Sequence, residues 1–309
     1  MAANISFKLS GYPDSTIRHS AAASLPRAGA AISNLKGASR AHHTQIGLGT
    51  LGFFAAKRNA PDWQSLVLVS NRHVLLAHDA ECGDIIFQPG YEEQGDQTVF
   101  DVSHLNAIAK IDHTGMCGHY HYTYPGEPEK PYFIDCATAA LLLKQTENPL
   151  RIHSKAQYFT QVARIHPHDT FEGRELKVRL PGRSDTIWGK VIDSEATVET
   201  VSGGRCHNTL VIRAIPGDKG ELHPFSRKGD SGALLVDQYQ RAVGLLWGQH
   251  MHDPYIAYAC HIHPVLSFLQ IIPWRFNFCA SQSTPKGGYD TAEKIHSISK
   301  LFPHRMEVR

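Results

Sequence analysis

The sequence lacks a dominant charge and a long apolar run. Its 309 residues carry 31 Lys and Arg against 29 Asp and Glu, a net charge of +2. No overall field therefore favours nucleic acid or an anionic membrane surface as a partner. No stretch approaches the roughly 18 apolar residues that a helix needs to span a bilayer. We expect neither a nucleic-acid partner nor a membrane partner.

The sequence also lacks closely spaced cysteines. Its six cysteines are scattered, and no two form a C-x-x-C pair. Cys136 and Cys260 lie inside apolar runs, where free thiols behave as small buried hydrophobes. Because no continuous apolar leader is present, these features favour a reducing, cytoplasmic location. Residues 15–40 are rich in Ala, Ser and Arg and poor in acids, so a transit peptide is the alternative to a loosely held arm.

Short apolar segments predict an all-β fold. Segments rich in branched and aromatic residues stand at 46–56, 64–70, 107–111 and 132–143, and shorter ones recur between 161 and 260. A polar stretch at 147–154 separates the two groups. Many short strands on either side of such a linker indicate two antiparallel β-barrels.

This pattern divides the chain into four parts. We assign residues 1–45 to an N-terminal arm and 46–150 to the first barrel. The second barrel covers 151–275 and ends in a helix over 263–272, which Pro273 stops. Residues 276–309 form a C-terminal tail, whose part after Cys279 begins with a linker of Ser, Thr, Pro and Gly.

One turn carries the strongest chemical signal. Residues 228–235 read K-G-D-S-G-A-L-L and present Ser231 just before an apolar strand. The flanking glycines let the backbone come close to a substrate. The amides of Gly229 and Ser231 can point at one spot, which is the geometry of an oxyanion hole. An ordinary turn before a strand is the alternative interpretation.

Two further residues complete a nucleophilic site. A neutral serine hydroxyl is a poor nucleophile and needs a base, and His73 directly follows a strand end in V-S-N-R-H-V. Asp135 is a carboxylate inside an apolar strand, where its burial is costly unless it is paired. A histidine partner would offset that cost. His73 as a plain loop residue and Asp135 as a capping residue are the alternatives, but the three contexts together predict a catalytic triad.

These segments resemble the trypsin-like serine peptidases. Residues 70–74, S-N-R-H-V, resemble the catalytic-histidine motif; 135–139, D-C-A-T-A, resemble the D-x-A strand; and 229–235 resemble the nucleophile motif. Residues 182–191 resemble the opening of the second barrel in a branch known mostly from bacteria and plants. The likeness spans 46–272 and implies a chymotrypsin fold of two six-stranded antiparallel barrels, with the triad between them and no cofactor.

The same resemblance implies a substrate site. Leu246, Trp247 and Gly248 lie in V-G-L-L-W-G, which resembles the strand lining the specificity pocket, and we add Lys228 beside the nucleophile motif. Phe225 lies near the position that sets specificity. We therefore expect an apolar or large residue before the scissile bond.

The sequence departs from the family at two points. No activation site precedes the first barrel, so Asp230 must find a partner other than a freed amine. Leu246 replaces the serine that usually precedes the pocket tryptophan, so Asp135 loses one expected hydrogen bond.

The chain holds 20 histidines, some in H-x-H pairs. Four such pairs put two imidazoles on one side of a strand, a spacing that can start a zinc site: His119 and His121, His166 and His168, His250 and His252, His261 and His263. No third ligand can be identified for any pair. We therefore expect surface histidines and no bound metal, with His250 and His252 as candidates for the rim of the cleft.

Taken together, the residues predict a serine endopeptidase that cleaves a protein or peptide substrate through an acyl-enzyme intermediate. A dedicated activator or target protein is a further expected partner by resemblance. The main alternative is a catalytically silent pair of barrels that binds peptides or a partner protein, and an esterase is a lesser one.

Overall fold

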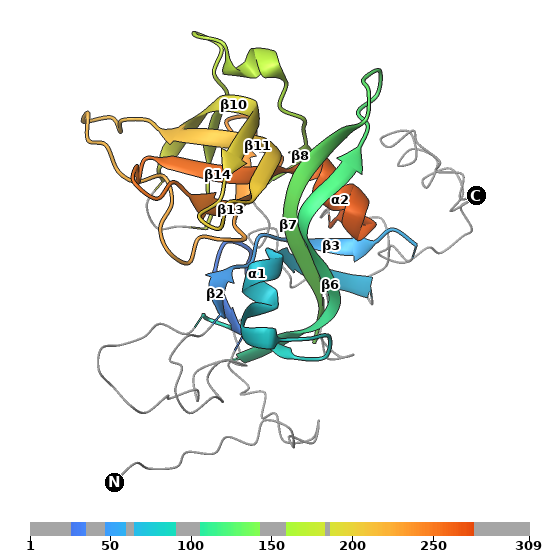
Figure 1. Ribbon diagram of the computed structural model, residues 1–309. Coiled ribbons are helices and arrows are strands. Elements are labelled where there is room, and N and C mark those ends of the chain that lie inside the picture. Colours follow the sequence, from blue (N-terminus) through green and yellow to red (C-terminus); the bar gives the residue numbers. More distant parts are fainter. Residues whose placement is uncertain are drawn as a thin grey trace, which may run out of the picture. The chain divides into compact units, whose positions relative to one another are not determined.

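The computed structural model describes residues 26–34, 47–59, 65–90, 106–142, 159–182 and 186–274, all within one compact unit that ends at Trp274. The predicted linker at 147–154 and the predicted tail at 276–309 lie outside these residues, as does most of the predicted arm. The described strands form two sheets (Figure 1).

The first sheet has eight strands. In order across the sheet they are β15 (Ile271–Pro273), β3 (Phe53–Lys57), β4 (Leu66–Ser70), β7 (Lys130–Leu141), β6 (Asn106–Tyr122), β5 (Ile85–Gln88), β1 (Ala31–Asn34) and β2 (Gly47–Thr50). All neighbouring pairs are antiparallel. The short helix α1 (Arg72–Leu75) follows β4, and a 3₁₀ helix (Ala77–Asp79) follows α1.

The second sheet has seven strands. In order across the sheet they are β12 (Leu234–Asp237), β9 (Lys177–Arg179), β10 (Trp188–Glu199), β11 (Arg205–Ala214), β14 (Ile256–His261), β13 (Arg241–Gln249) and β8 (Gln161–Val162). A 3₁₀ helix (Pro167–Thr170) precedes β9, and α2 (Ile262–Leu269) follows β14. Because β12 also pairs with β13, six of these strands are linked from neighbour to neighbour back to the first.

The predicted all-β fold with two antiparallel sheets is confirmed. The strand counts differ from six and six because short strands are added to both sheets. In the first sheet β1 comes from the predicted arm, and β15 crosses from the segment assigned to the second barrel. In the second sheet β8 is added as a short parallel strand beside β13.

Burial explains why part of the predicted arm joins the first sheet. Residues 32–34 are buried and pair with β2, and the last two of β1 also pair with β5. The side-chain amide of Asn34 donates to the carbonyl oxygens of Leu75 (2.8 Å) and Ala77 (3.2 Å). The segment thus anchors the end of α1. The first sheet begins before residue 46, the start that we predicted for the barrel.

The terminal helix is shorter than predicted. It ends at Leu269, because Gln270 takes a left-handed conformation with φ of 53° and its amide bonds to the carbonyls of Leu266 and Ser267. The next three residues then run antiparallel to β3. Among the described residues, no helix combines the length and the apolarity needed to cross a bilayer.

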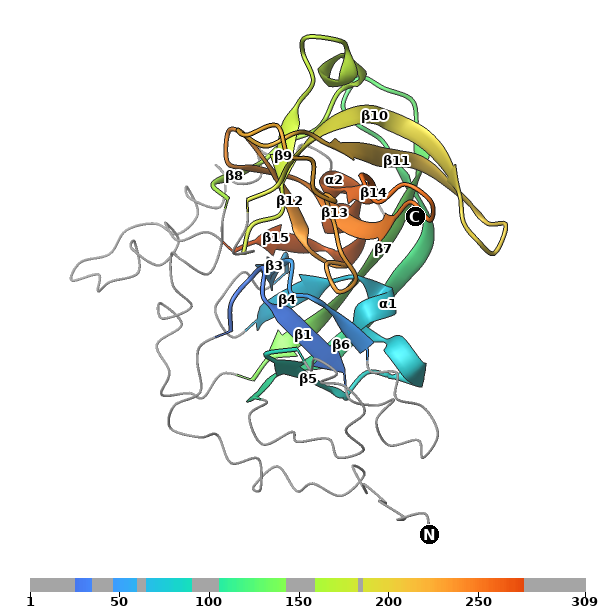
Figure 2. The same ribbon diagram turned by 90° about the vertical axis from the view of Figure 1, so that its left-hand side faces the viewer.

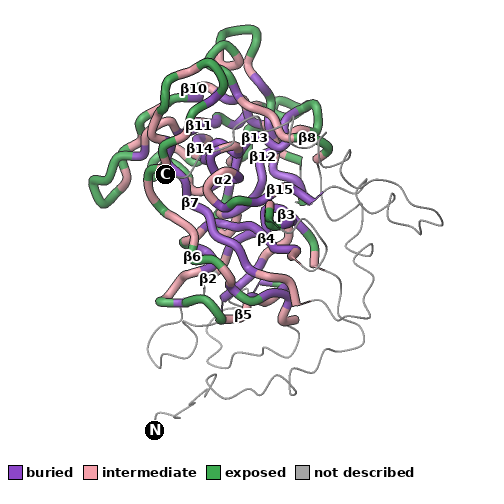
Figure 3. The backbone as a smooth tube through the Cα atoms, turned by 90° about the vertical axis from the view of Figure 1, so that its right-hand side faces the viewer, coloured by how far each residue is buried: buried purple, intermediate pink, exposed green. Residues whose placement is uncertain are grey.

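An apolar core shared by both sheets holds them together. It includes Val69 and Ile134 of the first sheet, Leu234 and Leu245 of the second, and Leu266 of α2. The two groups of strands lie one above the other in Figure 2, and β4 and β7 are mostly buried in Figure 3. A second core lies within the second sheet alone. The shared core thus contains residues from the end of β4, the middle of β7 and the start of β12.

The ladder between β6 and β7 is irregular next to Asp135. Its register shifts between Ile111 and His113 and again between His113 and Met116. Gly115 lies in the second shift with φ of 64°, and a Cβ there would collide with the carbonyl oxygen of Cys136. Only glycine fits this bulge.

We predict that Gly115→Ala lowers the free energy of unfolding by about 1–3 kcal/mol, through backbone strain and overpacking. Chemical denaturation measures the loss. Gly126→Ala is the matched control, because Gly126 also has a positive φ (80°) but open space around its Cβ position. Equal losses in both variants would contradict the close packing of the bulge.

Candidate active site

The α1 helix carries His73 to the surface of the first sheet. Asn71, its N-cap, has extended backbone, so the chain turns directly from β4 into the helix. Val74 and Leu75 are buried and fix the helix, whereas the side chain of His73 is 44% exposed. The buried residues of α1 therefore anchor the helix, while the imidazole of His73 stays accessible to solvent.

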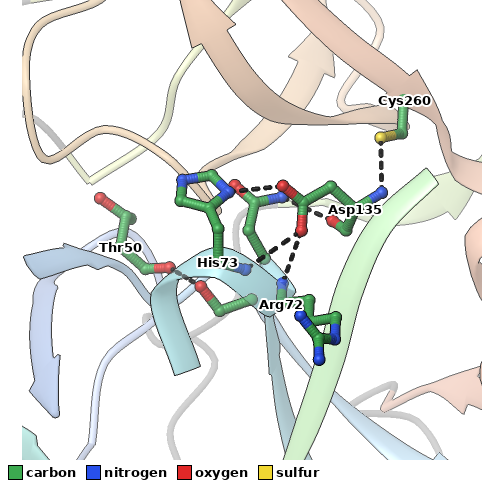
Figure 4. Close-up of polar contacts among 7 residues, drawn as sticks. Thr50, Arg72, His73, Asp135 and Cys260 are labelled. Carbon is green, nitrogen blue, oxygen red and sulfur yellow. Dashed lines mark hydrogen bonds and ion pairs between the residues drawn. The ribbon is translucent and has the colours of Figure 1, made fainter. Parts of the chain in front are cut away.

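Asp135 projects from β7 toward the start of this helix. The residue is only 2% exposed. One carboxylate oxygen accepts the backbone N–H groups of Arg72 (2.8 Å) and His73 (3.3 Å), and the other lies 2.5 Å from Nδ1 of His73 (Figure 4). The structure thus joins two of the three predicted triad residues directly.

This contact sets the proton affinity of His73. Burial alone lowers the pKa of the imidazole, but the hydrogen bond to Asp135 and the negative charge of its carboxylate outweigh that effect and raise the pKa above its ordinary value. The second ring nitrogen of His73 points away from Asp135 in Figure 4. A ring held in this way presents Nε2 to an incoming proton.

Ser231 lies on a turn that is tied to the first sheet through Thr50. The Thr50 amide donates to the carbonyl of Ser231 (2.8 Å), and its hydroxyl donates to the carbonyl of Gly229 (2.8 Å). The Thr50 carbonyl in turn accepts the hydroxyl of Ser70, next to α1 (2.8 Å). The described hydrogen bonds include none between the Ser231 hydroxyl and His73, so the structure links these two residues through the scaffold around Thr50.

The glycines of this turn have geometric roles. Gly229 and Gly232 have φ of 95° and 89°, in the region that other residues rarely adopt. A Cβ at Gly232 would collide with the Ser70 hydroxyl and crowd the Thr50 carbonyl. The turn that carries Ser231 can therefore approach the strand before α1 only because residue 232 is glycine.

Asp230 finds a partner within its own turn. Its carboxylate accepts the backbone N–H of Arg227 (2.7 Å), and its amide donates to the carbonyl of that residue (3.0 Å). Hydrogen bonds within the turn thus hold Asp230, and this arrangement requires no freed amine.

Three of the four predicted substrate residues are at least partly exposed, and the fourth, Leu246, is buried. Lys228 is exposed, and Trp247 and Gly248 are half-buried on β13. The Trp247 ring stacks on Tyr258, with centroids 5.4 Å apart, and tilts against Phe133 at 5.0 Å.

The burial of Leu246 and Phe225 does not fit the roles that the resemblance implied for them in the substrate site. Leu246 is only 2% exposed, because strand alternation turns its side chain into the core of the second sheet. Phe225 is fully buried in the same core, against Gly189. Neither side chain offers a surface that could select a substrate.

The histidine pairs differ in their surroundings. The pairs at 119 and 121, 166 and 168, and 250 and 252 are exposed as expected. His261 is not, since it is 3% exposed and donates from Nε2 to the carbonyl of Ser194 (2.7 Å). Among the described residues, no group of three or more His, Cys, Asp or Glu is arranged to hold a metal ion.

Burial of His261 makes the fold sensitive to acid. Its burial, together with the neighbouring His263 and Arg164, lowers the pKa of His261 to about 4, against the weaker opposing effects of the Ser194 carbonyl and of Glu195. A neutral ring in the folded state and an ordinary pKa of 6.5 in the unfolded chain mean that the unfolded chain takes up the proton first. This contribution to stability is complete above pH 6.5 and is lost as the pH falls toward 4.

We therefore predict that His261→Gln reduces the loss of stability between pH 6.5 and pH 4. Denaturant titrations across this range measure the slope of the unfolding free energy against pH. His121→Gln, at an exposed position, is the control and should keep the wild-type slope. A wild-type slope in His261→Gln would contradict the assignment.

Comparison with known proteins gives a structural likeness only. No model of a protein family matches the sequence, and no curated protein matches it. Among solved structures, protease A of Thermobifida fusca is similar at 14% identity, over 81% of this chain and 98% of that one, with a TM-score of 0.45. A Nocardiopsis protease is similar at 12% identity, over 82% and 100%, with a TM-score of 0.45.

A third similar structure is a glutamic acid-specific serine protease that uses a histidine triad in substrate binding. It shares 13% identity over 80% of this chain and 99% of that one, with a TM-score of 0.45. Likeness of this degree assigns no activity to this chain. The chemistry of the site rests on the residues described above.

The bond between Asp135 and His73 can be tested without any substrate. Asp135→Asn should lower the pKa of His73, because it removes the charge and weakens the hydrogen bond that raise it. An NMR titration of the imidazole protons measures the shift. Asp218→Asn removes an exposed carboxylate as a control and should leave the His73 pKa unchanged. An unchanged value in Asp135→Asn would show that the two side chains are not coupled.

Proposed function

We propose that the protein is a serine endopeptidase that hydrolyses peptide bonds of a protein substrate through His73, Asp135 and Ser231. The main support is the contact of 2.5 Å between a buried Asp135 carboxylate and a His73 ring whose other edge is accessible. A carboxylate placed in this way fixes the tautomer and the orientation of an imidazole that acts as a base.

Each side chain has a defined task in acyl transfer. His73 takes the proton of the Ser231 hydroxyl through Nε2 as the oxygen attacks the carbonyl carbon, and it later donates that proton to the leaving amine. Water then attacks the acyl-enzyme by the same route. The Asp135 carboxylate stabilises the imidazolium that forms. The raised pKa of His73 makes the neutral ring a stronger base toward the hydroxyl.

The turn around Ser231 supports an oxyanion hole. The positive φ of Gly229 and the bonds from Thr50 to the carbonyls of Gly229 and Ser231 restrain the backbone on the C-terminal side of both residues. Those bonds engage the carbonyl sides of these residues. The amides of Gly229 and Ser231 are the donors that we assign to the developing negative charge, a contribution that is often the largest in this kind of reaction.

The edge of β13 supports binding of an extended substrate. The β12–β13 ladder ends at the pair Leu234–Leu245, so the part of β13 from Trp247 onward has no β12 residue opposite it. Its other edge pairs with β14. A peptide can add as a strand along Trp247 and Gly248, with Lys228 near the nucleophile turn.

Labelling with a fluorophosphonate probe tests the proposal. We predict that the wild-type protein is labelled at Ser231, as identified by peptide mass spectrometry, and that Ser231→Ala is not. Ser202→Ala, which removes an exposed hydroxyl, is the control and should label normally.

In turnover of a peptide library, Asp135→Asn should reduce kcat by about 10⁴-fold.

Three results would reject the proposal. A folded wild-type protein that does not label favours the silent binding module, and a Ser231→Ala variant that still labels removes Ser231 as the nucleophile. Turnover of esters without turnover of peptides would assign the site to an esterase.

A further inference from the structure

Asp135 lies where its strand loses a neighbour. The β4–β7 ladder ends at the pair Ser70–Ala137, because the chain leaves β4 and enters α1 at Arg72. Two residues further along β7, Asp135 therefore has no β4 residue opposite it. The buried N–H and C=O groups of Asp135 need other hydrogen-bond partners there. Without them, the unpaired groups would destabilise the fold and the position of the main chain would be poorly defined.

Two side chains supply these partners. The Asn71 amide donates to the Asp135 carbonyl at 2.6 Å, and the Asp135 N–H donates to the Cys260 sulfur at 3.2 Å. The thiol lies on the opposite side of Asp135 from the His73 ring in Figure 4. All three residues are buried.

The two partners belong to different parts of the fold. Asn71 is the N-cap of α1, yet its side chain makes no capping bond and is directed to Asp135 instead. Cys260 lies on β14 of the second sheet, opposite Leu245 of β13. The main chain of Asp135 is therefore fastened at once to the helix that carries His73 and to the sheet that carries Ser231.

Cys260 does this without adding a charge. Burial, reinforced by the negative charge of Asp135, raises the pKa of the Cys260 thiol well above its ordinary value. The group stays a neutral thiol beside the carboxylate. The described free cysteines also include Cys206, a buried thiol in the same shared core.

We propose that Asn71 and Cys260 are positioning residues, which hold the main chain of Asp135 and thereby aim its carboxylate at His73. The inference rests on the proposed function. A small displacement of the Asp135 main chain moves the carboxylate away from Nδ1 of His73, and displacements of about 1 Å at such sites can cost roughly 100-fold in rate. Loss of either partner weakens the bond between Asp135 and His73.

Variants of Cys260 test this. Cys260→Ala removes the acceptor and should reduce kcat by up to about 100-fold while leaving KM near the wild-type value. It should also lower the His73 pKa, as measured by NMR. Cys260→Ser restores an acceptor and should recover most of both properties. Cys206→Ala is the matched control, because it deletes a buried thiol from the same core, and it should leave kcat and the His73 pKa unchanged.

Rates are expressed per site titrated with the fluorophosphonate probe, so that partial unfolding does not imitate the effect. Asn71→Ala should give the same two changes as Cys260→Ala. The inference is overturned if Cys260→Ala keeps the wild-type kcat and His73 pKa, if Cys260→Ser is as impaired as Cys260→Ala, or if Cys206→Ala is equally impaired.

The His73 pKa also separates this inference from the proposed function. If the wild-type protein neither labels nor turns over peptides, the peptidase proposal fails. A lowered His73 pKa in Cys260→Ala would still support the positioning of Asp135 by Cys260. If the wild-type protein is active and Cys260→Ala is unchanged, only the positioning fails.

Discussion

The contact between the buried carboxylate of Asp135 and the imidazole of His73 is the interaction on which the rest of the site depends. An ionised carboxylate away from water is strongly unfavourable unless charge and hydrogen bonds compensate it. Here two backbone amides at the start of α1 and the imidazole provide that compensation. These bonds have two effects. They hold α1 against β7, and they give the imidazole a fixed orientation with one edge exposed.

A second constraint couples the turn that carries Ser231 to this pair. Thr50 bonds to the carbonyls of Gly229 and Ser231 and accepts the Ser70 hydroxyl, so one residue of β2 connects the second sheet with the strand that leads to His73. The shared apolar core beneath these bonds keeps the two sheets in contact. The polar bonds of the buried residues Thr50 and Ser70 set the geometry of this junction, and the burial of apolar side chains supplies its cohesion.

Sequence reasoning succeeded where a local rule was sufficient. The alternation of short apolar segments predicted two antiparallel sheets, and an acid inside an apolar strand predicted a buried pair for Asp135. Features that depend on strand pairing or packing between distant parts of the chain were not predicted correctly. The short strands β1 and β15 carry weak patterns, and only burial against the first sheet defines them. The resemblance placed Leu246 in the substrate site and Phe225 near the position that sets specificity, although β-sheet alternation and core packing bury both side chains.

The sequence by itself determined the kinds of residue that could perform the chemistry: a serine between glycines, a histidine at a strand end and a carboxylate in an apolar strand. These patterns are local, so the chain displays them before it folds. Only the tertiary structure decided that the carboxylate meets the imidazole, that Thr50 binds the turn that carries Ser231, and that Cys260 and Asn71 bind the main-chain groups of Asp135. Those contacts join residues more than 60 positions apart, and no local pattern encodes the position of a group that the rest of the fold must bring into place.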